Sequence, residues 1–234
     1  MSTPAPPVVT PKGPVRPTLN RQRVLEAALA YADRHGLEAL SMHKLGVELG
    51  VKAMSLYNHV EDKDGVLDGL VELLWSEVAA DIPTPGDWRS AMRHLAMSLR
   101  AVVHRHPHVA PLVMSRQLMP QLALEVCETY LEMMRQGGVP EEYAVALLRA
   151  VFAYGFGHAL AELSCLPSGP AAGSDCDDLA RLRRVTAMVP AHVPDRLVRV
   201  ALKVCGDCDM GAQFAIGLDL MIRGLDVYLQ SSTT

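Results

Sequence analysis

The sequence has few aromatic residues and no pattern typical of β-strands. Aromatic side chains make up 5% of its 234 residues, and no segment alternates apolar and polar residues convincingly. The most apolar stretch, Ala144 to Leu163, is interrupted by Arg149, His158 and Glu162, so it fits a buried interface helix better than a membrane span. Half of all residues are apolar, which is ample for one large domain or two modest ones.

The chain also lacks a large excess of either charge. Its formal net charge is −4, which excludes a histone-like polycation. The charges are unevenly spread, because residues 1–60 hold seven Lys and Arg against four Asp and Glu, a local excess of +3. A mildly basic end on an acidic body fits a domain that meets phosphates through a few placed contacts.

Motifs for catalysis and for metal binding are missing or incomplete. We find no glycine-rich phosphate loop, nucleophile elbow or recognisable pair of carboxylates, so we expect neither an enzyme nor a cofactor. Three alternate histidines run from His104 to His108, but Pro107 interrupts their helix and favours a structural turn over a zinc site. Cys205 and Cys208 have CxxC spacing without a second half-site, which favours plain thiols.

The N-terminal residues are rich in proline. Residues 2–17 contain six prolines and no helical or strand period, so we expect a disordered arm over residues 1–18. The arm lacks the apolar core of a signal peptide, and the five cysteines are an odd number. Reduced thiols in a cytoplasmic protein are the simplest interpretation. Lys12, Arg16 and Arg21 fit either a minor-groove contact or a solvated tail.

Helical periodicity dominates the remainder and predicts an all-α fold. The expected helices cover residues 19–35, 41–50, 52–59, a long segment after 62, 87–106, 107–115, 117–136, 141–165, 177–189 and 209–229. Pro83, Pro85 and Gly86 mark a boundary between an N-terminal unit, residues 19–80, and a C-terminal unit, residues 87–230.

Residues 41–63 are the most informative segment. They predict two short helices around a glycine turn, followed by the start of a longer helix. The side chains expected to face inward are apolar: Leu45, Leu49, Leu56 and Val60. Those left facing outward are polar: Lys52, Ser55, Tyr57, Asn58 and His59. A short helix with such an outer face suits a DNA groove rather than a catalytic pocket.

The segment 19–75 resembles the DNA-binding domain of the tetracycline-repressor (TetR) family. The resemblance is carried by LNRQRVLEAAL at 19–29, HGLEALSMHKLGVELGV at 35–51 and SLYNHVEDKDGVLDGLVELLW at 55–75. Residues 87–229 are similar, mainly in helix order, to the ligand-binding and dimerisation domain of the subgroup like the tetracycline repressor. The resemblance implies a homodimer whose third helices enter successive major grooves of a palindromic operator.

Residue chemistry and resemblance together give the expected DNA contacts: Ser41, His43, Lys44, Lys52, Ser55, Tyr57, Asn58, His59 and Lys63. Tyr57, His59 and Lys63 stand where the family contacts phosphate, and lysine and serine suit base edges or flanking phosphates. The alternatives are a partly buried tyrosine for Tyr57 and plain solvated surface for Lys52 and Asn58. Three departures from the family pattern affect operator preference: Asn58 replaces an aromatic residue, His43 stands where the tetracycline repressor has arginine, and Gly46 replaces the usual alanine.

The resemblance also implies a small-molecule effector in the C-terminal unit. Candidate pocket residues are Trp88, Met92, His104, Met114, Arg116, Tyr130, Met134, Phe152, Phe156, His158 and Glu162, although each type is more often core filler. His158 and Glu162 are four residues apart, which permits a buried polar pair. Two alternatives share the fold: a regulator that acts only through protein partners, and a redox sensor built on Cys205 and Cys208.

The expected dimer contact uses the helices over 141–165 and 209–229, paired as a four-helix bundle. Both carry more apolar residues than one protomer core needs. The examples are Leu147, Leu148, Val151 and Phe152 on the first helix, and Phe214, Ile216, Leu218, Met221 and Ile222 on the second.

Overall fold

The computed structural model describes residues 18–83, 86–116, 119–165, 183, 186–187, 190, 192–204 and 210–231. Regular structure in these ranges is helical, with no strand, which confirms the all-α class. The helices are α1 Arg21–His35, the short 3-10 helix η1 Leu37–Ala39, α2 Met42–Leu49, α3 Ala53–Leu56, α4 Lys63–Ala80, α5 Trp88–Arg105, α6 Pro111–Ser115, α7 Gln121–Gln136, α8 Glu141–Cys165, α10 Asp195–Val204 and α11 Met210–Ser231.

Local capping chemistry sets the N-terminal ends of α1, α2 and α4. The Asn20 side chain accepts a hydrogen bond from the Arg23 N–H at 2.8 Å, and Asp62 accepts one from the Gly65 N–H at 2.8 Å. Ser41 caps α2 in the same way. At the C-terminal end of α2, Gly50 adopts a left-handed conformation with φ 68°.

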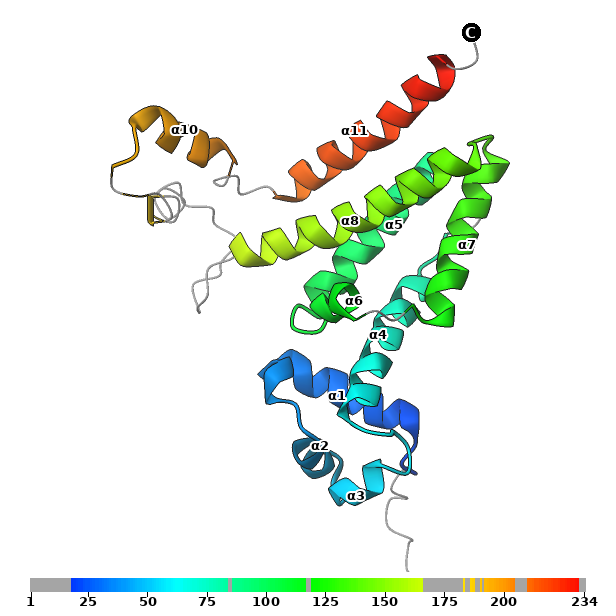
Figure 1. Ribbon diagram of the computed structural model, residues 1–234, viewed down its shortest axis with the longest axis vertical. Coiled ribbons are helices and arrows are strands. Elements are labelled where there is room, and N and C mark those ends of the chain that lie inside the picture. The colour runs from blue at the N-terminus through cyan, green and yellow to red at the C-terminus, as the bar shows by residue number, and fades with distance from the viewer. Residues whose placement is uncertain are drawn as a thin grey trace, which may run out of the picture.

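The N-terminal unit has its own core, and α4 connects it to the rest of the molecule. α1 packs against α4 and α2, and α2 packs against α3. In Figure 1, α4 rises from α1–α3 into the C-terminal unit, where it contacts α5, α6 and α7. One continuous hydrophobic core therefore runs through both units, including Leu25, Leu70 and Leu74 below and Trp88, Leu95 and Leu99 above.

The C-terminal unit is built around the packing of α5 on α8. α7 lies against both of these helices, and α11 lies along α8 and also touches α5 (Figure 1). By length and composition alone, Glu141–Ser164 of α8 could cross a membrane. This is weak evidence, because α8 packs against three other helices as the core helix of a soluble protein does.

Three expectations differ from the structure or lie outside it. α3 is shorter than the two turns expected over 52–59, because Lys52 is its extended N-cap and residues 57–59 form turns. α10 was not expected at all, and it lies apart from the other helices in Figure 1. The arm, Cys205, Cys208 and nearly all of the expected helix 177–189 lie outside the described residues.

Most of the side chains expected at a dimer contact are instead buried within the protomer. Leu147, Leu148, Val151, Phe214, Leu218 and Ile222 belong to its hydrophobic core. Phe152 and Met221 are partly buried against that core, and only Ile216 of the expected set is largely exposed. The periodicity identified apolar faces correctly, but the protomer itself covers most of them.

Candidate nucleic-acid interface and polar centre

The turn between α2 and α3 brings the two helices unusually close together. The Val51 N–H donates to the Gly46 carbonyl at 2.9 Å, directly after the left-handed Gly50. A Cβ atom on Gly46 would lie 2.9 Å from the Val51 carbonyl oxygen and 3.1 Å from the Ala53 nitrogen. Glycine at this position, where the family pattern has alanine, therefore permits α3 to sit against α2.

One side of α3 is anchored in the core and the other faces outward. Leu56 and Val60 are buried, as the sequence predicts, with Leu45 beneath them. Tyr57 is 45% exposed. Lys52 and Asn58 are exposed, whereas Ser55 and His59 are half-buried. His43 and Lys44 on α2 are also exposed, and Ser41 is half-buried because it caps the helix.

Sequence analysis missed the most exposed side chain of α3. Met54 is 75% exposed, although an apolar side chain normally gains about 1.5–3 kcal/mol from burial. Val47 on α2 is similarly exposed. The signal was present in the sequence, since Met54 lies two positions before the inward-facing Leu56.

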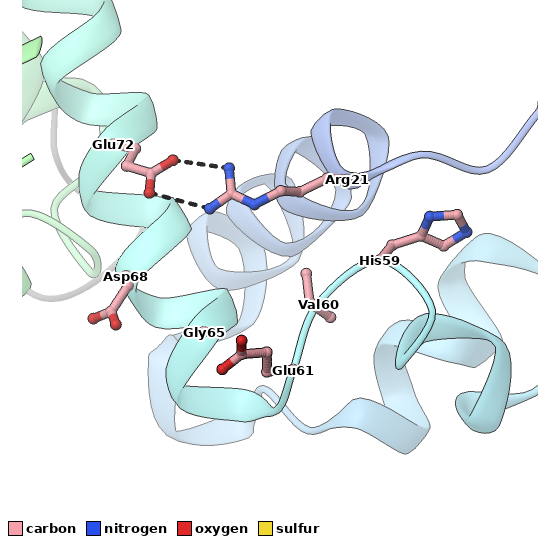
Figure 2. Close-up of a pocket in the computed structure, with 7 residues that line it drawn as sticks. All are labelled: Arg21, His59, Val60, Glu61, Gly65, Asp68 and Glu72. Carbon is pink, nitrogen blue, oxygen red and sulfur yellow. Dashed lines mark hydrogen bonds and ion pairs between the residues drawn. The ribbon is translucent and has the colours of Figure 1, made fainter. Parts of the chain in front are cut away.

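A groove of about 360 Å³ lies beside the start of α4. Figure 2 shows it between the first turn of α1, the loop after α3 and the first turns of α4. The Arg21 guanidinium donates to both carboxylate oxygens of Glu72, at 2.8 and 3.1 Å, while His59 projects from the loop. Arg21 is therefore bound to α4 here, and Lys63 is the exposed cation at the first position of α4.

The expected pocket residues of the C-terminal unit occupy three kinds of environment. Trp88, Met92, Tyr130, Met134 and Phe156 are buried in its core. Phe152 is half-buried and meets the Trp75 ring edge-on at 5.5 Å between centroids. Met114 is largely exposed on α6. The apolar and aromatic candidates thus lie in the core, at a contact with α4 and on the surface. They do not gather around one point.

Arg116 contacts the N-terminal unit. Its guanidinium binds Asp68 of α4 and lies 3.2 Å from a carboxylate oxygen of Asp64. These two carboxylates sit within the first two turns of α4, next to Lys63. Arg116 therefore joins the end of α6 to the helix that leads into the candidate nucleic-acid interface.

Four polar side chains do come together between α5 and α8. Glu162 is 4% exposed and accepts hydrogen bonds from Arg100 Nε at 2.9 Å and from His158 Nδ1 at 2.9 Å. His104 Nε2 binds the same carboxylate. We refer to Arg100, His104, His158 and Glu162 as the polar centre. The predicted pair of His158 and Glu162 is confirmed, and Arg100 is an addition that the sequence did not reveal.

Aromatic rings close one side of the polar centre. The Phe214 ring of α11 lies edge-on to the His158 ring at 5.2 Å, and the Arg100 guanidinium carbon is 5.5 Å from its centroid. Tyr154 stacks on Phe214 and donates its hydroxyl to the Phe214 carbonyl at 3.0 Å. Charged and aromatic groups thus meet where three helices converge.

The short α2–α3 pair with an outward face, joined to a helical C-terminal unit, defines a helix–turn–helix transcriptional regulator. The chain belongs to the TetR family: the family model described as "Tetracyclin repressor-like, C-terminal domain" matches residues 82–229. TetR regulators are generally DNA-binding proteins without enzymatic activity, in agreement with the absence of catalytic motifs noted in the sequence.

Named relatives agree with this assignment. The chain is 35% identical to the HTH-type transcriptional repressor DrrR1 of Streptomyces coeruleorubidus over 154 residues, 65% of this chain and 56% of that protein. It is 29% identical to the class D tetracycline repressor protein of Escherichia coli over 216 residues, 90% of this chain and 91% of that protein. It also resembles the crystal structure of the Streptomyces coelicolor TetR family protein ActR in complex with actinorhodin, with TM-score 0.71 and 27% identity over 90% of this chain and 98% of that one.

Proposed function

We propose that the chain is a cytoplasmic, homodimeric repressor that binds a palindromic DNA operator and is released by a small-molecule effector. In this proposal residues 19–80 form the DNA-binding domain and residues 87–230 the effector and dimerisation domain. The observation that carries the proposal is the α2–α3 pair: buried Leu56 and Val60 fix a short helix whose opposite face is open to solvent. Relatives named as repressors, and a neighbour with a bound ligand, support repression and effector release.

The proposed DNA contacts divide into two kinds. We assign Tyr57, His59 and Lys63 to phosphates, since they follow α3 and begin α4, where the helix dipole also favours an anion. Ser41, His43 and Lys44 of α2 are assigned to the neighbouring backbone. The proposed contacts to base edges come from residues in or next to α3: Lys52, Met54, Ser55 and Asn58.

Met54 adds a specific chemistry to this proposed interface. The major groove presents one prominent apolar group, the C5-methyl of thymine, and an exposed thioether side chain can lie against it. The 75% exposure of Met54 leaves the side chain free for such a contact. We therefore assign each half-site a thymine that faces Met54.

We propose that the polar centre binds and orients the effector. An apolar pocket needs a few fixed polar groups to recognise a ligand, and Arg100, His104 and Glu162 supply donors and acceptors next to the Phe214 ring. Phe152, Phe156 and the buried methionines would supply apolar contacts. Arg116 and its partners on α4 link the C-terminal unit to the DNA-binding domain.

Selection of random-sequence duplexes with the purified protein tests the proposal directly. We expect enrichment of an inverted repeat whose half-site centres are about 34 Å apart, one turn of DNA. Tyr57→Phe should weaken binding roughly fivefold per half-site, because one hydrogen bond contributes about 1 kcal/mol. Lys63→Met should lower the salt slope by about one per half-site. Tyr31→Phe on α1 is the matched control and should bind as the wild type does.

The same duplexes test Met54. Replacing each selected thymine by uracil removes one methyl group, and we expect one symmetric position to lose affinity with wild-type protein but not with Met54→Ala. Selection that yields no inverted repeat would contradict operator binding. A normal operator without methyl sensitivity would reject only the role of Met54.

A further inference from the structure

His106 lies at the junction between the two units of the chain. It caps the C-terminal end of α5 and is 6% exposed. Its Nδ1 atom is 2.8 Å from a carboxylate oxygen of Asp33 in α1, and its Nε2 atom is 2.9 Å from a carboxylate oxygen of Glu77 in α4. One imidazole ring therefore connects the end of α5 to two helices of the N-terminal unit.

The two contacts together constrain the proton content of the ring. An ionised carboxylate only accepts hydrogen bonds, and a neutral imidazole has only one N–H to donate. The ring can satisfy both Asp33 and Glu77 only when both nitrogens carry hydrogen. A neutral ring would place a nitrogen lone pair against a carboxylate oxygen at a buried site, which is costly.

The charges around the ring lead to the same conclusion. Arg105, the residue before His106, binds the other carboxylate oxygen of Glu77. Asp33 faces the ring from α1, Glu77 from α4 and Arg105 from α5, so a protonated ring makes the group neutral and a neutral ring leaves one negative charge in excess. The second oxygen of Asp33 is buried and has no hydrogen-bond partner among the described residues, so within them the Asp33 carboxylate is held by His106 alone.

We propose that His106 is a proton-dependent latch: its protonated ring holds α1 and α4 against α5, and loss of the proton loosens the two units from each other. The consequence for operator affinity rests on the proposed function, because α1 and α4 carry and orient the α2–α3 pair. The latch is closed at low pH and opens as the pH rises. Protonation is needed for the closed junction, so the stability that it adds is present at low pH and lost as the pH rises.

Hydrogen exchange without DNA tests the latch separately from operator binding. Backbone amides in the last two turns of α1 and around Glu77 in α4 are followed at pH 6.0 and 8.5, each corrected for its intrinsic exchange rate. We expect protection in the wild type to fall at least about fivefold between these values and the thermal midpoint to drop by roughly 2 to 4 °C. His108→Gln changes an exposed histidine two residues away and should reproduce the wild-type behaviour.

Two variants distinguish a latch from a purely structural residue. His106→Gln cannot gain a proton, so its junction should exchange at the same corrected rate at both pH values. In Asp33→Asn, the amide can donate to a neutral ring that donates in turn to Glu77, so the junction should stay protected at pH 8.5. This second variant remains informative if His106→Gln fails to fold.

Operator affinity provides the functional readout, with the selected duplex as probe. Wild-type protein should lose at least about fivefold more affinity from pH 6.0 to 8.5 than Asp33→Asn does. Equal pH dependence of exchange in wild type and both variants would overturn the latch, whatever the DNA result. A pH-dependent junction in a protein that binds no duplex would uphold the latch and reject the proposed function instead.

Discussion

Glu162 shows how single residues set the chemistry of the C-terminal unit. Burial alone would raise the pKa of this carboxyl, but hydrogen bonds and charge from Arg100 and His104 outweigh burial and lower the pKa below its ordinary value. The His158 contact was predictable, since four residues on one helix share a face. Arg100 and His104 belong to α5, about sixty residues earlier, and nothing in the sequence indicates which α5 residues meet α8.

Acid stability tests this account of Glu162. A carboxyl whose pKa is lowered on folding adds stability above its unfolded value, near 4.5, and loses it as the pH falls through the folded value. Glu162→Gln should therefore lower the free energy of unfolding by about 3 kcal/mol at pH 7 and flatten its decline below pH 4.5. Urea unfolding from pH 3 to 7 measures both effects. Glu132→Gln, in a surface pair with Arg135, should change little, and an equal loss in both variants would contradict the assignment.

At the scale of helices, ends were predictable where capping is local. Ser41, Gly50 and Asp62 perform the capping roles that their residue types indicate. The ends of α3 were not predictable, because its length depends on how closely α2 approaches. α10 was not expected, because proline usually interrupts a helix; here Pro194 directly precedes the helix, where its lack of an N–H costs nothing.

Gly46 provides a test of the α2–α3 geometry. Alanine normally stabilises a helix interior relative to glycine by about 0.5–1 kcal/mol. Here its Cβ would press on the Val51 backbone, so Gly46→Ala should instead destabilise the protein by about 1–3 kcal/mol and weaken operator binding. Gly65→Ala is the control, since a Cβ there meets nothing closer than 3.7 Å. Thermal unfolding of both variants decides the sign, and a stabilised Gly46→Ala protein would show that α2 and α3 are farther apart.

For the whole molecule, the sequence indicated the fold and family but not the surface that a second copy would cover in the proposed dimer. Apolar periodicity marks α8 and α11 as two-sided, yet it does not distinguish side chains buried in the protomer from those left outside. Arg89 and Arg93 of α5 hold α11 through Asp226 and Asp219, which fixes the side that α11 turns inward. The exposed apolar set on these helices is Val145, Ile216, Leu220, Val227 and Tyr228.

The oligomeric state tests whether this set forms the dimer contact. Leu220 is 68% exposed, so replacing it with Glu should leave the protomer core intact. In a dimer, the same change would bury two unpaired carboxylates, and we expect Leu220→Glu to be a monomer at micromolar concentration. Sedimentation measures the mass, and operator titration should show affinity reduced by at least about a hundredfold, since one protomer reaches only one half-site. Leu124→Glu changes a similarly exposed leucine on α7, outside the exposed apolar set of α8 and α11, and should remain dimeric. A dimeric Leu220→Glu protein with normal operator affinity would place the contact on another surface, and a monomeric wild-type protein would contradict the proposed homodimer.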